Sequence, residues 1–183
     1  MILALNFCAE AFAMRAMLMC TTLLIGLLFA TFAGAHQATP TSDSETAICT
    51  FEDGKQVTAR YDAIGIGKNE SAPVGKALMP GGTAMTFFTE TDLTIGNASI
   101  PPGGYTMYVI PGKKEWTFII SKNVKVDAKY DDKMDLARLT METGQLTTPA
   151  DKLSIYFGHT GPKKCEVDVD YGKTRGWAEF RQK

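Results

Sequence analysis

The sequence predicts an all-β protein: a single antiparallel β-sandwich of about nine or ten short strands after an N-terminal signal segment. Two observations lead to this fold class. Between residues 92 and 121, three apolar segments are separated by Gly and Pro at turn spacing, which is typical of a meander of antiparallel strands. Elsewhere in the chain, short segments of alternating apolar and polar residues are again separated by turns.

The first predicted hairpin joins residues 48–51 to residues 56–61 through Asp53-Gly54. Asp-Gly is the preferred pair for a tight two-residue turn in which both residues have a positive φ, so we expect that turn here. Residues 63–82 follow as the longest irregular segment, with five glycines and two prolines. Any site is expected in this loop or at the strand ends beside it.

Further strands are predicted over residues 84–90, 93–95, 105–110, 115–121, 135–142, 153–157, 164–170 and 174–180. Apolar residues occupy both faces of the segment 105–110, which indicates a central strand covered on both sides. The segment 135–142 is also compatible with a short helix. Its alternation of Ala137, Leu139 and Met141 with polar residues favours a strand.

The first 35 residues are interpreted as a signal peptide. Residues 16–33 carry no charge, Arg15 precedes them, and Ala33-Gly34-Ala35 follows as a small-residue cleavage site. The region before Arg15 contains only an acidic charge, which leaves both Met1 and Met14 as possible starts. A retained membrane anchor is the alternative, because the apolar run is near the shortest that spans a bilayer. We expect cleavage after Ala35 and an exported protein, periplasmic or extracellular, that contacts a membrane only if this segment stays uncleaved.

Three regions are therefore predicted: a signal peptide over residues 1–35, a flexible polar lead-in over 36–46 and a β-sandwich domain over 47–183. The formal net charge is −1, so neither a basic nor an acidic excess is present. This balance argues against a nucleic-acid partner. The sequence identifies no other partner.

Two cysteines, Cys49 and Cys165, remain after the predicted cleavage, and two cysteines in an exported domain suggest one disulfide. The alternation around each of them places both thiols on the apolar side of their strands. Two buried free thiols that never meet are the alternative. In the chain-entropy model such a bond would stabilise the fold by about 4–5 kcal/mol.

Several segments carry a family resemblance: residues 92–96 (DLTIG), 101–108 (PPGGYTMY), 110–112 (IPG) and 115–120 (EWTFII). With them the chain resembles the bacterial exported family called domain of unknown function 2911. The resemblance implies a β-sandwich and export, and no known reaction. Such members carry a segment of the type Trp-Arg-Thr-Gly-Ala-Asn-Glu before the strand predicted at 84–90. Residues 77–83 read ALMPGGT here, so the Trp, Arg, Asn and Glu are missing.

No residue is predicted to be catalytic or to bind an organic cofactor, because no nucleophile, zinc or phosphate-loop motif occurs. A copper site is the main alternative. If cleavage makes His36 the first residue, its α-amino group and imidazole, together with His159, would offer the planar nitrogen ligands that Cu(II) prefers. Otherwise His159 is interpreted as an exposed turn histidine.

Carboxylates offer a second alternative, since a pair such as Asp62 and Glu70 could hydrolyse glycosides. The acidic residues between 127 and 135 fit no EF-hand spacing and are interpreted as a solvated loop. A sugar-binding platform could be built from Tyr105, Tyr108, Trp116, Tyr156, Tyr171 and Trp177. Aromatics at period two are more typical of a core, so an exposed pair would be needed.

The function predicted from the sequence is therefore that of an exported, non-catalytic β-sandwich domain, with a binding or cell-envelope role and an unidentified ligand. A periplasmic copper-binding protein and a carbohydrate-binding or carbohydrate-active domain remain open as alternatives.

Overall fold

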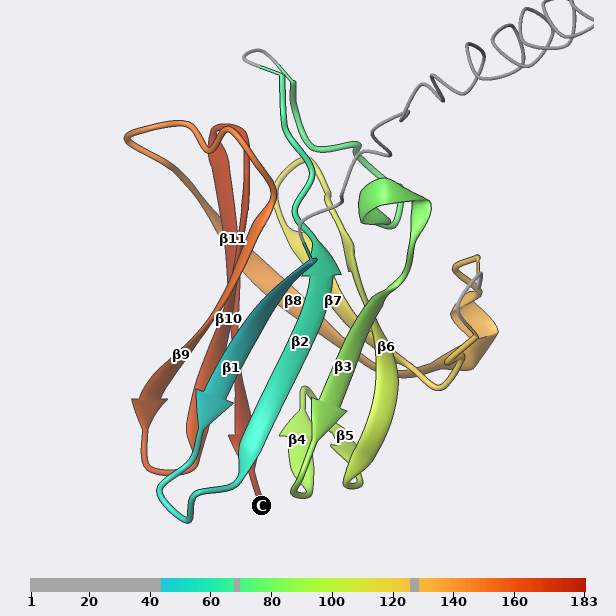
Figure 1. Ribbon diagram of the computed structural model, residues 1–183, viewed down its shortest axis with the longest axis vertical. Helices are drawn as coiled ribbons and strands as arrows, with labels where there is room; N and C mark the ends of the chain where they lie inside the picture. The colour runs from blue at the N-terminus through green and yellow to red at the C-terminus, as the bar shows by residue number, and fades with distance from the viewer. Residues whose placement is uncertain (1–43, 68–69, 126–128) are drawn as a thin grey trace, which may run out of the picture. The chain divides into compact units, whose positions relative to one another are not determined.

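Eleven antiparallel strands and two short 3-10 helices make up the part of the chain that the computed structural model describes, residues 44–67, 70–125 and 129–183 (Figure 1). The predicted signal peptide, both possible start residues (Met1 and Met14) and His36 lie outside these residues. The strands are β1 Ser44–Thr50, β2 Gln56–Asp62, β3 Met85–Thr89, β4 Leu93–Ile95, β5 Ala98–Ile100, β6 Gly103–Ile110, β7 Trp116–Ser121, β8 Asp135–Gln145, β9 Ser154–Gly161, β10 Lys164–Tyr171 and β11 Thr174–Gln182. The 3-10 helices are Pro80–Gly82 and Asp132–Met134.

One hydrogen-bonded path, β1-β2-β3-β6-β7-β8-β11-β10-β9, folds back on itself to form the two layers of a nearly closed, barrel-like sandwich. The turn between layers lies within β8. Residues 135–141 of this strand pair with β7, whereas residues 142–145 pair with β11. A strand that passes from one sheet into the next makes a corner of this kind. The predicted all-β antiparallel sandwich is confirmed, and so is the choice of a strand over a helix at residues 135–142.

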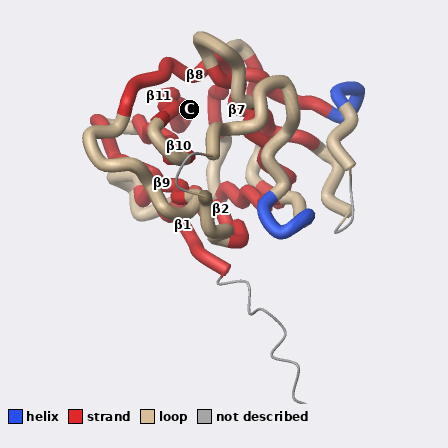
Figure 2. Tube along the Cα trace, turned by 90° about the horizontal axis from the view of Figure 1, so that it is seen from above, coloured by secondary structure: helices blue, strands red, loops and turns tan. Residues whose placement is uncertain are grey.

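The two ends of this path, β1 and β9, lie next to each other in the view from above (Figure 2). Side chains link them. The Tyr61 hydroxyl, on a side chain that is only 4% exposed, accepts a hydrogen bond from the Ile155 amide (2.9 Å) and donates one to Glu45 Oε2 (2.8 Å). Lys152 forms an ion pair with the same Glu45 carboxylate. These contacts join the first and last strands of the path.

Aromatic rings from both layers meet in the centre of the core. The ring of Phe87, on β3, lies edge-on to Phe118 on β7 at 6.3 Å between centroids. It also lies edge-on to Phe157 on β9 and Phe180 on β11, at 6.2 and 6.4 Å. Edge-to-face contacts at these distances add to the free energy gained from burial. Phe87 therefore connects the two layers.

The outer face of β6 and β7 is covered as well, as the apolar residues on both faces of segment 105–110 predict. Tyr108 and Ile119 are fully buried there although they lie outside the main core. The segment that leads from β7 to β8 places the Tyr130 ring 5.1 Å from that of Tyr108. Arg138 Nη1 then donates to the Tyr130 hydroxyl (2.7 Å), which anchors the segment to β8.

Two local features differ from the sequence prediction. A strand not predicted, β5, pairs with β4 through a Gly96-Asn97 turn and forms a short hairpin with it. The Asp53-Gly54 turn is also of another type. Phe51 and Lys55 pair across a three-residue loop in which Gly54 has a φ of +82° and Asp53 does not have a positive φ. This is a type I turn followed by a left-handed glycine.

Candidate functional site

The predicted disulfide is present. Cys49 on β1 and Cys165 on β10 are bonded across 116 residues of sequence, and both are almost completely buried. The bond joins the first strand of the path to the strand beside the last one. It therefore reinforces the contacts of Tyr61 at the junction between β1 and β9.

The copper prediction is not tested by the structure, because His36 lies outside the described residues. His159 is exposed, as predicted, but it lies within β9 opposite Cys165 and not in a turn. Within residues 44–183 as described, no three His, Cys, Asp or Glu side chains come close enough together to hold a metal ion. In the same residues no helix is long and apolar enough to cross a membrane.

The loop at residues 63–82 packs against the sandwich. Ile66 and Leu78 are buried in the core, and the Leu78 amide donates to the Val109 carbonyl (2.8 Å). The Tyr171 hydroxyl donates to Glu70 Oε1 (2.7 Å), and this hydrogen bond holds the pKa of Glu70 below its ordinary value. A general acid for glycoside hydrolysis needs a raised pKa, so the paired Glu70 carboxylate does not suit that role.

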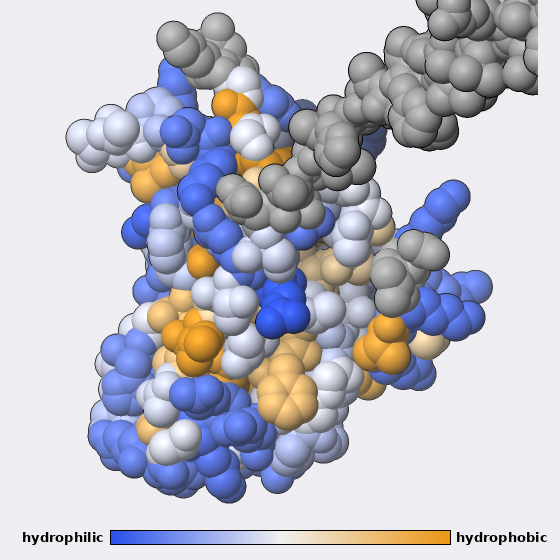
Figure 3. Space-filling view, viewed as in Figure 1, coloured by the Kyte–Doolittle hydropathy of each residue, from blue (hydrophilic) through white to orange (hydrophobic). Residues whose placement is uncertain are grey.

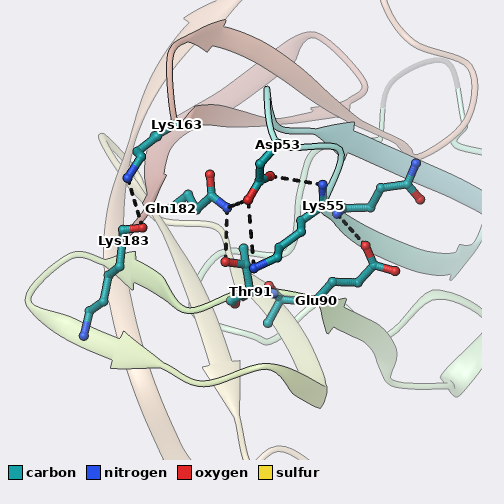
Figure 4. A network of polar contacts seen from close by, with 9 residues as sticks. Asp53, Lys55, Glu90, Thr91, Lys163, Gln182 and Lys183 are labelled. Carbon is teal, nitrogen blue, oxygen red and sulfur yellow. Dashed lines mark hydrogen bonds and ion pairs between the residues drawn. The ribbon is translucent and has the colours of Figure 1, made fainter.

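A polar cleft of about 720 Å³ lies beside the β1–β2 hairpin. Figure 1 shows this hairpin at the end of the sandwich away from the loop at residues 63–82, and Figure 4 shows polar side chains of the cleft. It is lined by Glu52, Asp53, Lys55, Thr91, Asp92, Lys163, Gln182 and Lys183. The turn between β3 and β4, the turn between β9 and β10 and the end of β11 supply the residues that the hairpin does not. The cleft depends on three turns and one strand end that are distant in sequence, and no local pattern predicts their meeting.

Polar side chains in this cleft bind one another. Gln182 Nε2 donates to Asp53 Oδ2 (2.7 Å) and to Thr91 Oγ1 (3.1 Å), and Figure 4 shows all three side chains converging. The hydrogen bond from Gln182 holds the pKa of Asp53 below its ordinary value. Lys163 Nζ donates to the backbone oxygen of Lys183 (3.3 Å). This network ties the end of β11 to the hairpins around it, so its main effect is structural.

The acidic segment before β8 is also used structurally. Asp131 Oδ1 accepts from the Lys133 amide (3.1 Å) and caps the short 3-10 helix. Asp135 Oδ2 accepts from the Tyr130 hydroxyl (2.8 Å) and from Arg138 Nη1 (2.6 Å). Asp132 begins the same helix, and Asp127 lies outside the described residues.

The six aromatic residues considered as a sugar platform separate into two groups. Trp116, Tyr108 and Tyr171 are buried, and Tyr105 is partly buried with its hydroxyl bonded to the Pro101 carbonyl (2.8 Å). Tyr156 is 50% exposed, and Trp177 is partly exposed. Both lie on the outer face of the layer formed by β9, β10, β11 and the end of β8.

Asp168 is the direct neighbour of both exposed aromatics, because it pairs with Tyr156 on β9 and with Trp177 on β11. In the next row Asp170 pairs with Arg175, and Arg175 Nε and Nη2 bond the two oxygens of Asp170 at 2.6 and 2.7 Å. We call the set Tyr156, Asp168, Asp170, Arg175 and Trp177 the aromatic-acidic face.

Carboxyl groups on this layer have raised pKa values. Burial raises the pKa of Asp168, against the lowering effect of Arg175. Burial, with the negative charges of Asp168 and Glu179, also raises the pKa of Glu166. The sequence alone indicates that Glu166, Asp168 and Asp170 share one face of their strand, since they alternate with core residues. It does not show that Tyr156 and Trp177 flank Asp168, because that depends on the register of three strands.

The outer face of the other layer is different. Ile48 on β1 and Phe88 on β3 are about half exposed there, and both pair with Thr58 on the strand between them. Figure 3 shows this side as a largely hydrophilic surface with separate apolar patches. Ile48, Thr58 and Phe88 include one aromatic ring and no carboxylate, so they do not repeat the arrangement of the aromatic-acidic face.

The fold and these surfaces define a disulfide-bonded antiparallel β-sandwich with polar side chains at one end and an aromatic-acidic face on one layer. The family model described as Protein of unknown function (DUF2911) matches residues 42–179. The chain therefore belongs to this family, as the resemblance implied. No curated protein and no solved structure matches the chain.

Proposed function

We propose that this protein is an exported, non-catalytic domain that binds a component of the cell envelope or its surroundings. The observation that carries the proposal is the aromatic-acidic face. It places an exposed aromatic ring, Tyr156, and a partly exposed one, Trp177, beside a fixed guanidinium on a rigid sheet. Exposed aromatics and arginine on a rigid scaffold are common in binding surfaces.

Export is supported by the disulfide and by the predicted signal peptide. A structural disulfide persists in oxidising compartments and is rare in the cytosol. The Cys49–Cys165 bond is buried and joins two strands that are distant in sequence, as in a structural rather than a catalytic disulfide.

A non-catalytic role is supported by the surroundings of the carboxyl groups. Glu70 is bonded to Tyr171, and Asp53 is bonded to Gln182. The groups with raised pKa values, Glu166 and Asp168, are partly buried on the outer face of a sheet. Catalysis by a carboxyl pair gains from an enclosed site, and neither residue lines the polar cleft at the end of the sandwich.

Two measurements test this proposal. Intact mass spectrometry of the protein from the periplasmic or extracellular fraction should give a chain that begins at His36 and lacks two hydrogens because of the disulfide. Purified protein should then co-sediment with cell-envelope fragments of the producing organism. The Tyr156→Ala/Trp177→Ala variant should sediment far less. A cytosolic chain with its N-terminal segment intact would refute export, and equal sedimentation of the variant would refute the assignment of the surface.

A further inference from the structure

We infer that the aromatic-acidic face binds a neutral saccharide, with pyranose rings stacked on Tyr156 and Trp177 and hydroxyl groups hydrogen-bonded by Asp168 and Arg175. This inference rests on the proposed binding function and names its ligand class. A pyranose ring has apolar C–H faces and a rim of hydroxyl groups. A surface that recognises it therefore needs aromatic faces next to charged hydrogen-bonding groups.

The spacing of the two rings suits such a ligand. Tyr156, Asp168 and Trp177 are opposite one another on three adjacent strands, so all three side chains are on one face of the sheet. Adjacent strands are about 4.8 Å apart, which places the Cα atoms of Tyr156 and Trp177 about 10 Å apart. A saccharide chain that crosses the strands could stack one ring on each aromatic, with Asp168 in reach of the hydroxyls between them.

Gly144 gives Trp177 room to lie against the sheet. A Cβ atom at Gly144 would lie 3.1 Å from Cζ3 and 3.2 Å from Cη2 of the Trp177 indole. No third atom of the indole lies within 4 Å of that position, so the outer edge of the six-membered ring abuts the backbone of β8 at a residue with no side chain. This contact fixes the position of the indole without covering its faces there, and Trp177 stays partly exposed.

Arg175 lies in the row next to Asp168 and is held by carboxylates beside Tyr156. Its bidentate bonds to Asp170 use two of the five N–H donors of a guanidinium. Its Cζ atom lies 5.9 Å from the centre of the Tyr156 ring, and its Nε lies 3.9 Å from Asp168 Oδ1. A guanidinium fixed by a carboxylate needs little reordering to donate to hydroxyl oxygens.

The charges on this layer select against anions. Its outer side carries the carboxylates of Glu142, Glu166, Asp168, Asp170 and Glu179, against the cations of Lys164, Arg175 and Arg181. Arg175 is paired with Asp170, and both Lys164 and Arg181 are paired with Glu179. A phosphate-rich, sulfated or uronic-acid polymer would meet Glu166 and Asp168, so an uncharged saccharide fits better.

The test measures the binding of defined oligosaccharides to the disulfide-bonded protein. The probes are cellohexaose, chitohexaose and laminarihexaose, with an oligogalacturonate as the anionic counterpart. Calorimetry gives the affinity, and tryptophan fluorescence reports the site, because the second tryptophan, Trp116, is only 3% exposed. We expect at least one neutral probe to bind and to change the emission of Trp177. The oligogalacturonate should bind more weakly.

Three variants locate the site. Tyr156→Ala and Trp177→Ala should each weaken binding about tenfold or more. Gly144→Ala should weaken it as well, because the added methyl group would displace the edge of the indole from β8. The control is Phe88→Ala, which removes a 49% exposed aromatic from the other layer and should leave the affinity unchanged.

The outcomes separate the two proposals. If envelope fragments are bound through Tyr156 and Trp177 but every neutral probe fails, the ligand class is wrong and the binding function stands. If a neutral probe binds equally to the wild type and to both alanine variants, the site is wrong. Circular dichroism of each variant identifies any loss of binding that comes from unfolding.

Discussion

At the scale of single residues, Gly112 shows how close two backbone segments can lie. A Cβ atom there would lie 2.1 Å from the carbonyl oxygen of Glu115, a distance at which the turn before β7 would have to open. We therefore expect Gly112→Ala to lower the free energy of unfolding by about 3 kcal/mol, measured by urea denaturation. Gly104→Ala is the matched control, since a Cβ there has no atom within 4 Å. Equal effects of the two substitutions would contradict this explanation.

Tyrosine ionisation should make the fold sensitive to alkali. Burial, with the hydrogen bond to Glu70, raises the pKa of Tyr171 to about 12, and burial raises the pKa of Tyr61 as well. Free tyrosine ionises near pH ~10. Above that pH the unfolded chain releases protons that the folded chain keeps, so the free energy of unfolding falls as the pH rises.

The contribution of these two tyrosines is complete below pH ~10 and is lost as the pH rises through the raised values. Unfolding measured between neutral pH and pH ~12 should show this decline, and it should be shallower in the Tyr61→Phe/Tyr171→Phe variant. The variant starts from a lower stability because the bonds to Glu45 and Glu70 are gone. An unchanged slope in the variant would show that other groups cause the alkaline loss.

At the scale of elements, β11 and β7 pack closely because Gly176 has no side chain. A Cβ at Gly176 would lie 2.8 Å from Cε3 of Trp116, the indole at the start of β7. Gly176→Ala should therefore destabilise the protein by about 1–3 kcal/mol, as overpacking does in a dense core. Thermal denaturation followed by circular dichroism measures the change.

A double variant tests whether this contact is the cause. Gly176→Ala combined with Trp116→Leu should be less destabilised than the sum of the two single variants, because the smaller side chain makes room for the methyl group. Additive effects would mean that Gly176 matters for a reason other than its contact with Trp116.

The strands themselves follow from local patterns, but their partners do not. The alternation in residues 135–142 predicts β8 and the inward direction of Ala137 and Met141, both of which are buried. It does not predict that the strand leaves β7 after Met141 and continues on β11. Alternation specifies the two faces of a strand, whereas the choice of neighbour depends on how distant segments pack.

At the scale of the whole molecule, the disulfide joins the first strand of the path, β1, to β10, the strand beside the last one. A bond that closes 116 residues should stabilise the fold by about 4–5 kcal/mol in the chain-entropy model. Cys49→Ala/Cys165→Ala should lose most of this amount, measured by denaturant unfolding against the oxidised wild type. Reduction of the wild type should give a similar loss. A loss well below 1 kcal/mol would mean that Tyr61 and its neighbours hold the junction without the bond.

The sequence by itself determined the all-β class, ten of the strands and the inward faces of the strands that carry Cys49, Cys165 and Met141, because period-two alternation is a local signal. It favoured a bond between Cys49 and Cys165 over two free thiols, and the structure contains that bond. The sequence also led to the signal peptide, which stays a prediction. Only the tertiary structure decided that the loop at residues 63–82 packs on the core, that a polar cleft forms at the opposite end, and that Tyr156 and Trp177 flank Asp168. The physical reason is that registers and the meeting of turns arise from packing between segments up to a hundred residues or more apart, as in the contact of Gln182 with Asp53.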